Sequence, residues 1–183
     1  MLELRQHEGV AARALEFAIL TAGRTGEVIG ARWDEVNQAE RLWTVPASRM
    51  KARKEHRVPL SAPAMAVIEK MASDRQNDFI FPGETSGRLG QPAMRWLAKK
   101  IGGPQMTGHG FRSTFRDWAA ERSNFPREVA EMALGHVVGD AVERAYRRGD
   151  LFEKRRQLAE AWARYCSTPV RATGGVVPIR AQA

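Results

Sequence analysis

Four segments of the 183-residue chain hold more phosphate-binding and proton-transfer groups than a protein core requires. They are residues 23–27, the connection 49–55, residues 108–112 and the stretch 134–146. Their reactive side chains belong to Arg24, Lys51, His109, Arg112, His136 and Tyr146, with Glu27 shortly after the first arginine. Guanidinium forks match the oxygens of a phosphate, imidazoles transfer protons near neutral pH, and a phenol can act as a nucleophile. These residue types therefore predict chemistry at a phosphate group.

The order of these residues resembles that of a known family. Arg-x-x-Glu, a lysine in a hairpin, His-x-x-Arg, Leu-Gly-His and Ala-Tyr follow one another along the chain. Each motif alone occurs by chance in many helical proteins, but the ordered set in its local contexts is specific. The set resembles the catalytic domain of tyrosine recombinases, the phage integrase family, and segments 21–27, 56–61 and 145–150 are similar to prophage and genomic-island integrases. The likeness covers Ala11 to Tyr165.

The resemblance implies a nucleophile and a cationic clamp. By resemblance, the Tyr146 phenol attacks the phosphorus of a DNA phosphodiester, forms a 3′-phosphotyrosyl bond and releases a 5′-hydroxyl. The phosphate oxygens repel the phenol and gain charge in the transition state, so cations must already be in place. Arg24 and Arg112 are expected to clamp these oxygens, and His136 is expected to add a third donor.

The same resemblance implies the groups that move protons. The leaving 5′-oxygen needs a proton, and we assign the donor to Lys51, because the family donor lies where the first hairpin strand turns; Lys54 is the alternative. His109 is expected to accept the tyrosine proton or to hold the hydrogen bonds of the site. Glu27 is expected to brace an arginine or a helix. No cofactor is implied, because the protein–DNA ester conserves the bond and side chains supply the cations that a metal would otherwise provide.

The charge of the chain favours a polyanionic partner. There are 29 Lys and Arg residues against 21 Asp and Glu residues, which gives a net charge of +8, and the excess is not confined to one tail. Such a surface attracts nucleic-acid phosphates and releases their counterions. We therefore expect double-stranded DNA as the partner. Phosphate contacts are expected from basic residues near the hairpin and the nucleophile: Arg53, Lys54, Arg57, Arg147 and Arg148.

The hydrophobic pattern predicts a mixed, mainly α-helical fold with one small antiparallel β-hairpin sheet, as in tyrosine recombinase catalytic domains. A buried helix is expected over 10–21, followed by a short helix capped by Thr25. The hairpin strands are expected at 42–45 and 56–60, and a short extended piece at 79–82. Further helices are expected at 64–71, 92–100, 111–122, 126–135 and 140–146. Asp150 and Glu153 resemble a capping box that starts a closing helix.

We expect a catalytic domain over residues 1–166 and a flexible tail over 167–183, where the composition turns to Pro, Gly, Val and Ala without a period. The single Cys166 excludes an intramolecular disulfide, and no apolar run is long enough for a membrane span, so we expect a cytoplasmic protein. Integrases of this type usually carry a core-binding domain before the catalytic helices. Because the first catalytic helix is expected close to the start of the sequence, we expect an excised catalytic fragment or a decayed gene.

Several residues have structural interpretations as well. Taken alone, Arg24 and Arg112 would be assigned to salt bridges with Glu27 or Asp117. Tyr165 is assigned to the apolar core face of the closing helix, which leaves Tyr146 as the nucleophile. The five tryptophans are predicted to pack in the protein and not to stack on bases: Trp33, Trp43, Trp96, Trp118 and Trp162. His7 and His56 are taken as structural, with no metal site.

The expected function is site-specific DNA recombination, the integration or excision of a mobile element such as a viral genome, by strand cleavage and rejoining. By resemblance, the active assembly is a homotetramer on two DNA attachment sites, with a C-terminal segment passed to a neighbour and a directionality factor as a further partner. Two alternatives stay open. One is a type IB topoisomerase-like enzyme, which shares much of this chemistry, and the other is an inactive DNA-binding integrase remnant.

Overall fold

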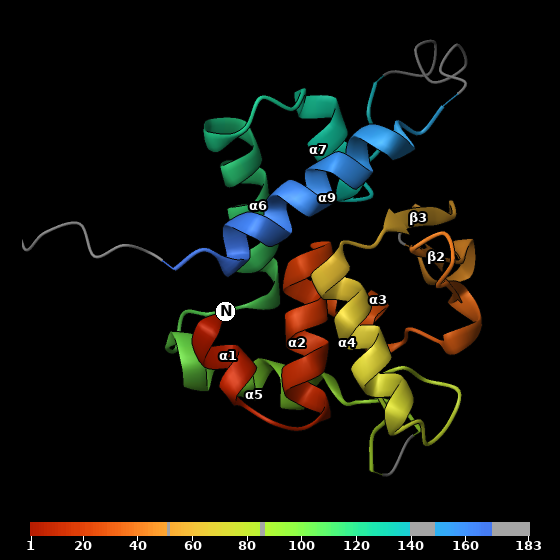
Figure 1. Ribbon diagram of the computed structural model, residues 1–183, viewed down its shortest axis with the longest axis vertical. Coiled ribbons are helices and arrows are strands. Elements are labelled where there is room, and N and C mark those ends of the chain that lie inside the picture. The colour runs from red at the N-terminus through yellow and green to blue at the C-terminus, as the bar shows by residue number, and fades with distance from the viewer. Residues whose placement is uncertain (51, 85–86, 140–148, 170–183) are drawn as a thin grey trace, which may run out of the picture.

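A central, buried helix organises the molecule. The computed structural model describes residues 1–50, 52–84, 87–139 and 149–169. Helix α2 (Val10–Thr21) runs through the middle, with α4 (Ala62–Ser73), α5 (Gln91–Gly102) and α9 (Phe152–Ser167) packed against it, and a small sheet lies at one edge (Figure 1). Among the described residues, no helix combines the length and the apolar character needed to cross a membrane.

Helix α2 is buried because its sequence is apolar on nearly every face. All residues from Ala12 to Thr21 are buried, which is typical of a core helix. The bounds predicted for this helix are confirmed. The short helix α1 (Leu2–Gln6) in front of it is not predicted from the sequence; it buries only Leu4 and packs against α2.

The end of α2 creates the junction at which the first arginine of the motif lies. Ala22 takes the left-handed conformation, with φ 49°, and the next helix, α3 (Thr25–Ile29), begins three residues later. Arg24 is the N-cap residue of α3, and its backbone N–H donates to the Glu27 carboxylate at 2.9 Å. The prediction that Thr25 caps this helix is therefore wrong, because Thr25 is the first helical residue and Arg24 is the N-cap residue, whose own N–H is bound by the Glu27 carboxylate.

The β-hairpin predicted from the alternating pattern is confirmed, with one additional short strand. Strands β1 (Val36–Asn37), β2 (Leu42–Val45) and β3 (His56–Pro59) form an antiparallel sheet in the order β1-β2-β3. Leu42 pairs with Pro59, and Val45 pairs with His56. One-turn helices η1 (Trp33–Glu35) and η2 (Ala47–Arg49) flank the strands. The connection 49–55 therefore begins at η2 and returns into β3 at His56.

The remaining helices match the predicted ones to within a few residues. They are α4 and α5, α6 (Gly108–Arg122) and α7 (Arg127–Ala133). Helix α6 begins three residues before the predicted start at Phe111, because the Thr107 hydroxyl accepts the Gly110 N–H at 3.0 Å and caps it. The helix predicted over 140–146 lies outside the described residues, as does most of the predicted tail.

The predicted capping box at the start of α9 is wrong. Leu151 is the N-cap residue, and no side chain caps the helix. Asp150 instead accepts hydrogen bonds from Arg155, one of them from Nε to its backbone carbonyl at 2.8 Å. Arg155 is only 2% exposed, and a buried guanidinium must donate its hydrogen bonds to acceptors within the protein. Asp150 therefore accepts from Arg155 and does not cap the helix.

The predicted packing of the aromatic residues is confirmed in part. Trp43, Trp118 and Trp162 are buried, and Trp162 donates its Nε1–H to the Ile19 carbonyl at 2.7 Å. Trp96 is wrongly assigned to packing, because it is 62% exposed on α5. The assignment of Tyr165 to the core is also wrong, since this residue is 42% exposed even though its ring contacts Trp118 and Trp162.

Candidate active site

The first arginine of the motif is held by its own helix. The Nη1 atom of Arg24 lies 2.6 Å from a carboxylate oxygen of Glu27, and Glu27 is buried. Glu27 thus braces both the backbone and the guanidinium of Arg24, the role that the resemblance implies for it. About a third of the Arg24 side chain, 31%, stays exposed, so the ion pair leaves part of the guanidinium open to a ligand.

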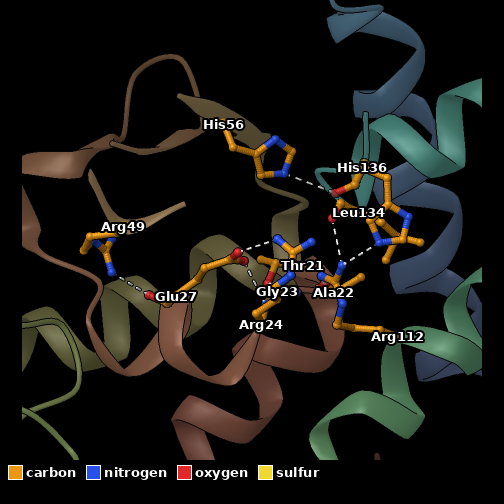
Figure 2. A network of polar contacts seen from close by, with 11 residues as sticks. Thr21, Ala22, Gly23, Arg24, Glu27, Arg49, His56, Arg112, Leu134 and His136 are labelled. Carbon is orange, nitrogen blue, oxygen red and sulfur yellow. Dashed lines mark hydrogen bonds and ion pairs between the residues drawn. The ribbon is translucent and has the colours of Figure 1, made fainter. Parts of the chain in front are cut away.

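The second arginine joins two helix ends. Arg112 Nη1 donates to the carbonyl of Ala22 at the end of α2, and Nη2 donates to the carbonyl of Leu134 at the end of α7, at 2.7 Å (Figure 2). Carbonyls at helix C-termini carry partial negative charge, which suits a guanidinium. Among the described residues, the alternative salt bridges of Arg112 are not formed, because its hydrogen-bond partners are these carbonyls and the His136 ring, and Asp117 lies instead near Arg116.

The two guanidinium groups act on each other electrostatically. Burial, followed by the nearby charge of Arg24, lowers the pKa of Arg112 to about 10, and Glu27 partly opposes this shift. Arg112 therefore remains protonated at neutral pH, but its charge is incompletely compensated. Such a cluster favours an anion with several oxygens, and a phosphodiester is one.

His136 lies on the same cluster. Its Nε2 atom approaches Arg112 Nη2 at 3.5 Å, and its Nδ1 atom lies 2.6 Å from a Glu131 carboxylate oxygen. The imidazole is placed there by the turn that ends α7, in which Leu134 is the C-cap residue and Gly135 has a φ of 64°. Arg24, Arg112 and His136, far apart in the sequence, thus meet around the end of α2 (Figure 2).

His109 lies on the first turn of α6, three residues before Arg112, and is exposed. Residues three apart share a helix face, so His109 and Arg112 lie on the same side of α6. Gly108 lets this turn approach α3 closely, because a Cβ atom there would lie 2.5 Å from Thr25 Oγ1. The position of His109 is thereby tied to α3, the helix of which Arg24 is the N-cap residue.

His56, which is predicted to be structural, makes a contact beside this cluster. His56, at the start of β3, places Nε2 3.2 Å from the Ala133 carbonyl oxygen at the end of α7 (Figure 2). Burial, and next the charge of Arg155, lowers the pKa of His56 to about 4, so the ring is neutral at neutral pH and donates through Nε2–H. The two partners are 77 residues apart, and no local pattern reveals the contact; its only signal is that His56 belongs to a segment that carries the family resemblance.

Arg49, at the start of the hairpin connection, has no role predicted from the sequence. Its guanidinium donates to the Glu27 carbonyl at 2.9 Å and to the Glu35 carboxylate. Glu35 also accepts the Trp43 indole N–H at 3.1 Å. Arg49 therefore fastens the start of the hairpin connection to α3, the helix that carries Arg24 and Glu27.

The hairpin connection and the α7 turn line a common cavity of about 700 Å³. Lys54, His56 and His136 are among its lining residues. Val138 and Gly149, which stand on either side of residues 140–148, also line it. Tyr146, Arg147 and Arg148 belong to that segment, and they and Lys51 lie outside the described residues, so their assigned roles stay predictions.

The three described candidates for DNA contact differ in their surroundings. Arg53 and Lys54 are exposed on the hairpin connection. Arg57 is half-exposed, lies over the Phe152 ring at 4.3 Å and approaches the Asp150 carboxylate at 3.5 Å. Contacts with DNA phosphates stay a prediction for all three residues.

Relatives of known sequence point to one family. The model of the phage integrase family matches residues 4–151. Prophage integrase IntA of Escherichia coli (strain K12) is 37% identical over 149 residues, which cover 79% of this chain and 36% of that protein. The integrase of Shigella phage Sf6 is 31% identical over 156 residues, which cover 82% of this chain and 40% of that protein. The chain thus spans less than half the length of these two relatives.

Solved structures show the same fold. The integrase from mycobacterium phage Brujita superimposes with a TM-score of 0.66 at 17% identity, over 84% of this chain and 52% of that one. The XerA recombinase superimposes with a TM-score of 0.56 at 20% identity, over 81% of this chain and 62% of that one. The mainly helical fold with its small antiparallel sheet is therefore the fold of a tyrosine recombinase catalytic domain, and the chain belongs to the phage integrase family.

Proposed function

We propose that this chain is the catalytic part of a site-specific DNA recombinase that cleaves and rejoins attachment sites through a 3′-phosphotyrosyl bond on Tyr146. The observation that carries the proposal is the meeting of Arg24, Arg112 and His136. His136 also lines a cavity together with Val138 and Gly149, which precede and follow the segment that contains Tyr146 in the sequence. Three preplaced donors suit the charge that develops on a phosphodiester under attack.

The proposed cleavage step exchanges one ester for another. The Tyr146 oxygen forms a bond to phosphorus while the bond from phosphorus to the 5′-oxygen breaks, and Arg24 and Arg112 stabilise the charge on the non-bridging oxygens. His109 takes the phenolic proton, and Lys51 gives a proton to the leaving 5′-oxygen. Attack by the 5′-hydroxyl of a second strand reverses these transfers and releases Tyr146. No external energy source enters, because each step conserves the number of phosphoester bonds.

The proposed substrate is double-stranded DNA that carries two attachment sites, and the proposed assembly is a homotetramer with a directionality factor as an accessory partner. The high positive charge of the chain supports the first of these proposals. The family membership, together with the names of relatives from a prophage and a phage, supports integration or excision of a mobile element as the biological setting.

The test uses a nicked suicide duplex that traps the cleaved state. The chain is incubated with the duplex in EDTA, and protein–DNA adducts are resolved on a denaturing gel. Tyr146→Phe is expected to keep DNA affinity and to lose the adduct. The matched control is Tyr165→Phe, which removes the other tyrosine of the chain and is expected to leave the adduct intact.

Three results would count against the proposal. An undiminished adduct in the Tyr146→Phe variant would contradict the assignment of the nucleophile. Relaxation of supercoiled DNA at sites of any sequence would favour the topoisomerase alternative. DNA binding without any adduct in the unmodified chain would favour the inactive remnant.

A further inference from the structure

Glu131 holds His136 through two separate contacts. The backbone N–H of His136 donates to the Glu131 carbonyl at 3.0 Å, which closes the turn at the end of α7. The side-chain carboxylate of Glu131 also contacts His136, with one oxygen 2.6 Å from the Nδ1 atom of the ring. The Glu131 side chain is only 17% exposed, whereas 39% of the His136 side chain is exposed. The carboxylate therefore lies behind the imidazole and leaves the rest of the ring open.

The turn is built so that the imidazole folds back onto this carboxylate. Gly135 has a φ of 64°, a conformation that side chains with a Cβ rarely adopt. A Cβ atom there would also lie 3.2 Å from Met50 Cε and 3.4 Å from the His56 ring. Glycine thus allows the chain to reverse at this point and bring His136 beside Glu131.

The contact determines which ring nitrogen carries hydrogen. An ionised carboxylate only accepts hydrogen bonds, so a nitrogen 2.6 Å from it must carry a proton. That nitrogen is Nδ1. The other nitrogen, Nε2, then faces the guanidinium of Arg112 and lies 3.5 Å from its Nη2 atom. The ring edge that is free of Glu131 is therefore turned towards the arginine cluster.

We propose that Glu131 is a positioning residue of the active site, whose carboxylate fixes the orientation and the Nδ1–H tautomer of His136 so that Nε2 faces the phosphate clamped by Arg112. This inference rests on the proposed function for its consequence in catalysis. To donate to a phosphate oxygen, Nε2 must first take up a proton from solvent, after which the ring carries hydrogen on both nitrogens and a positive charge. Glu131 then offsets that charge in a site that already contains Arg24 and Arg112.

The first test observes the imidazole without any reaction. Long-range ¹H–¹⁵N NMR of the DNA-free chain is expected to show the Nδ1–H form of His136, and Glu131→Ala is expected to move the ring towards the Nε2–H form. An Nε2–H tautomer in the unmodified chain, or a tautomer unchanged by Glu131→Ala, would overturn the inference. This readout does not depend on DNA cleavage, so it separates a failure of the inference from a failure of the proposed function.

The second test measures single-turnover cleavage. Glu131→Ala is expected to slow cleavage by about 10- to 100-fold, because loss of ring orientation misplaces a transition-state donor. Glu131→Gln removes the same charge but keeps an oxygen that accepts from Nδ1–H, so it is expected to cleave faster than Glu131→Ala and more slowly than the unmodified chain. Glu69→Ala, at an exposed position on α4, controls for the loss of one negative charge away from the site.

A double-mutant cycle distinguishes positioning from a general structural role. In a His136→Ala background, Glu131→Ala is expected to cause no further loss of cleavage rate, because the residue acts through the imidazole. A full additional loss in that background, or a Glu131→Gln variant as slow as Glu131→Ala, would overturn the inference.

Discussion

At the scale of single residues, Arg112 links the fold to the proposed chemistry. Its guanidinium is nearly buried, and the carbonyls of Ala22 and Leu134 fix it between the ends of two helices. The same contacts bring the guanidinium beside Arg24 and His136. A planar fork with five donors can serve two carbonyls and still offer N–H groups to a phosphate, whereas an ammonium cannot reproduce that geometry.

Arg112→Lys is therefore expected to damage both properties. We predict a loss of cleavage activity of about 100-fold or more, as for removal of a transition-state donor. We also predict a decrease of about 1 to 3 kcal/mol in the free energy of unfolding, because a buried carbonyl at a helix end loses its partner. Suicide-substrate kinetics and denaturant unfolding measure the two effects. Arg116→Lys, at an exposed position on the same helix, is the control, and an Arg112→Lys variant as active as that control would contradict the assigned role.

Sequence order was enough to single out Arg24, Glu27, Arg112 and His136 as candidates, because their types and spacing are those of a family motif, and the structure brings the four residues together. The contacts that hold them were not predictable in the same way. The carbonyl partners of Arg112 carry no side-chain signature, since every residue has a carbonyl group. The exposure of Trp96 and Tyr165 was missed for a related reason: an apolar residue at helical spacing identifies a face, but not whether another element covers it.

At the scale of elements, the junction between β3 and the end of α7 positions the site. His56 donates to the Ala133 carbonyl at 3.2 Å. The carbonyl of the next residue, Leu134, accepts a hydrogen bond from Arg112. The hairpin and the helical half of the molecule are thus joined through neighbouring peptide groups. Periodicity predicted both elements, but not their contact, because pattern within a segment contains no information about its distant neighbour.

This junction is expected to make stability depend on pH. The pKa of His56 falls from 6.5 to about 4 on burial, so between these pH values the unfolded chain binds a proton that the folded chain does not. The contribution of neutral His56 to the free energy of unfolding is therefore fully present above about pH 6.5. It decreases by about 3 kcal/mol as the pH falls towards 4.

Urea unfolding at a series of pH values measures this dependence. His56→Gln keeps a donor for the Ala133 carbonyl but does not titrate, so its stability is expected to vary less between pH 6.5 and 4. His7→Gln, near the N-terminus, is the control and is expected to keep the slope of the unmodified chain. An equal slope in the His56→Gln variant would show that other groups cause the acid sensitivity.

At the scale of the whole molecule, charge is expected to govern the proposed encounter with DNA. The chain carries a net charge of +8 and spans 36% and 40% of the lengths of the two relatives described above. The fold class was predictable from periodicity and from the family resemblance together. The extra helix α1 was not, because five residues that bury a single leucine leave no periodic signal.

Binding to DNA is expected to weaken steeply with salt, since each neutralised phosphate contributes about −0.9 to the slope of log affinity against log salt concentration. Lys54→Ala is expected to reduce that slope by about 1, because Lys54 is exposed at the cavity that His136 also lines. Lys70→Ala, exposed on α4, is expected to leave the slope unchanged. Fluorescence anisotropy over a salt series compares the two, and equal slopes would place Lys54 outside the DNA interface.

The most direct measurement is identification of the residue that becomes linked to DNA. The trapped adduct is digested with trypsin and nuclease, and the modified peptide is identified by mass spectrometry. Cleavage after Arg144 and Arg147 would release residues 145–147 with a 3′-phosphonucleotide on Tyr146, which is the predicted result. A nucleotide on the peptide 165–171, which contains Tyr165, or an adduct on a residue other than tyrosine, would contradict the account.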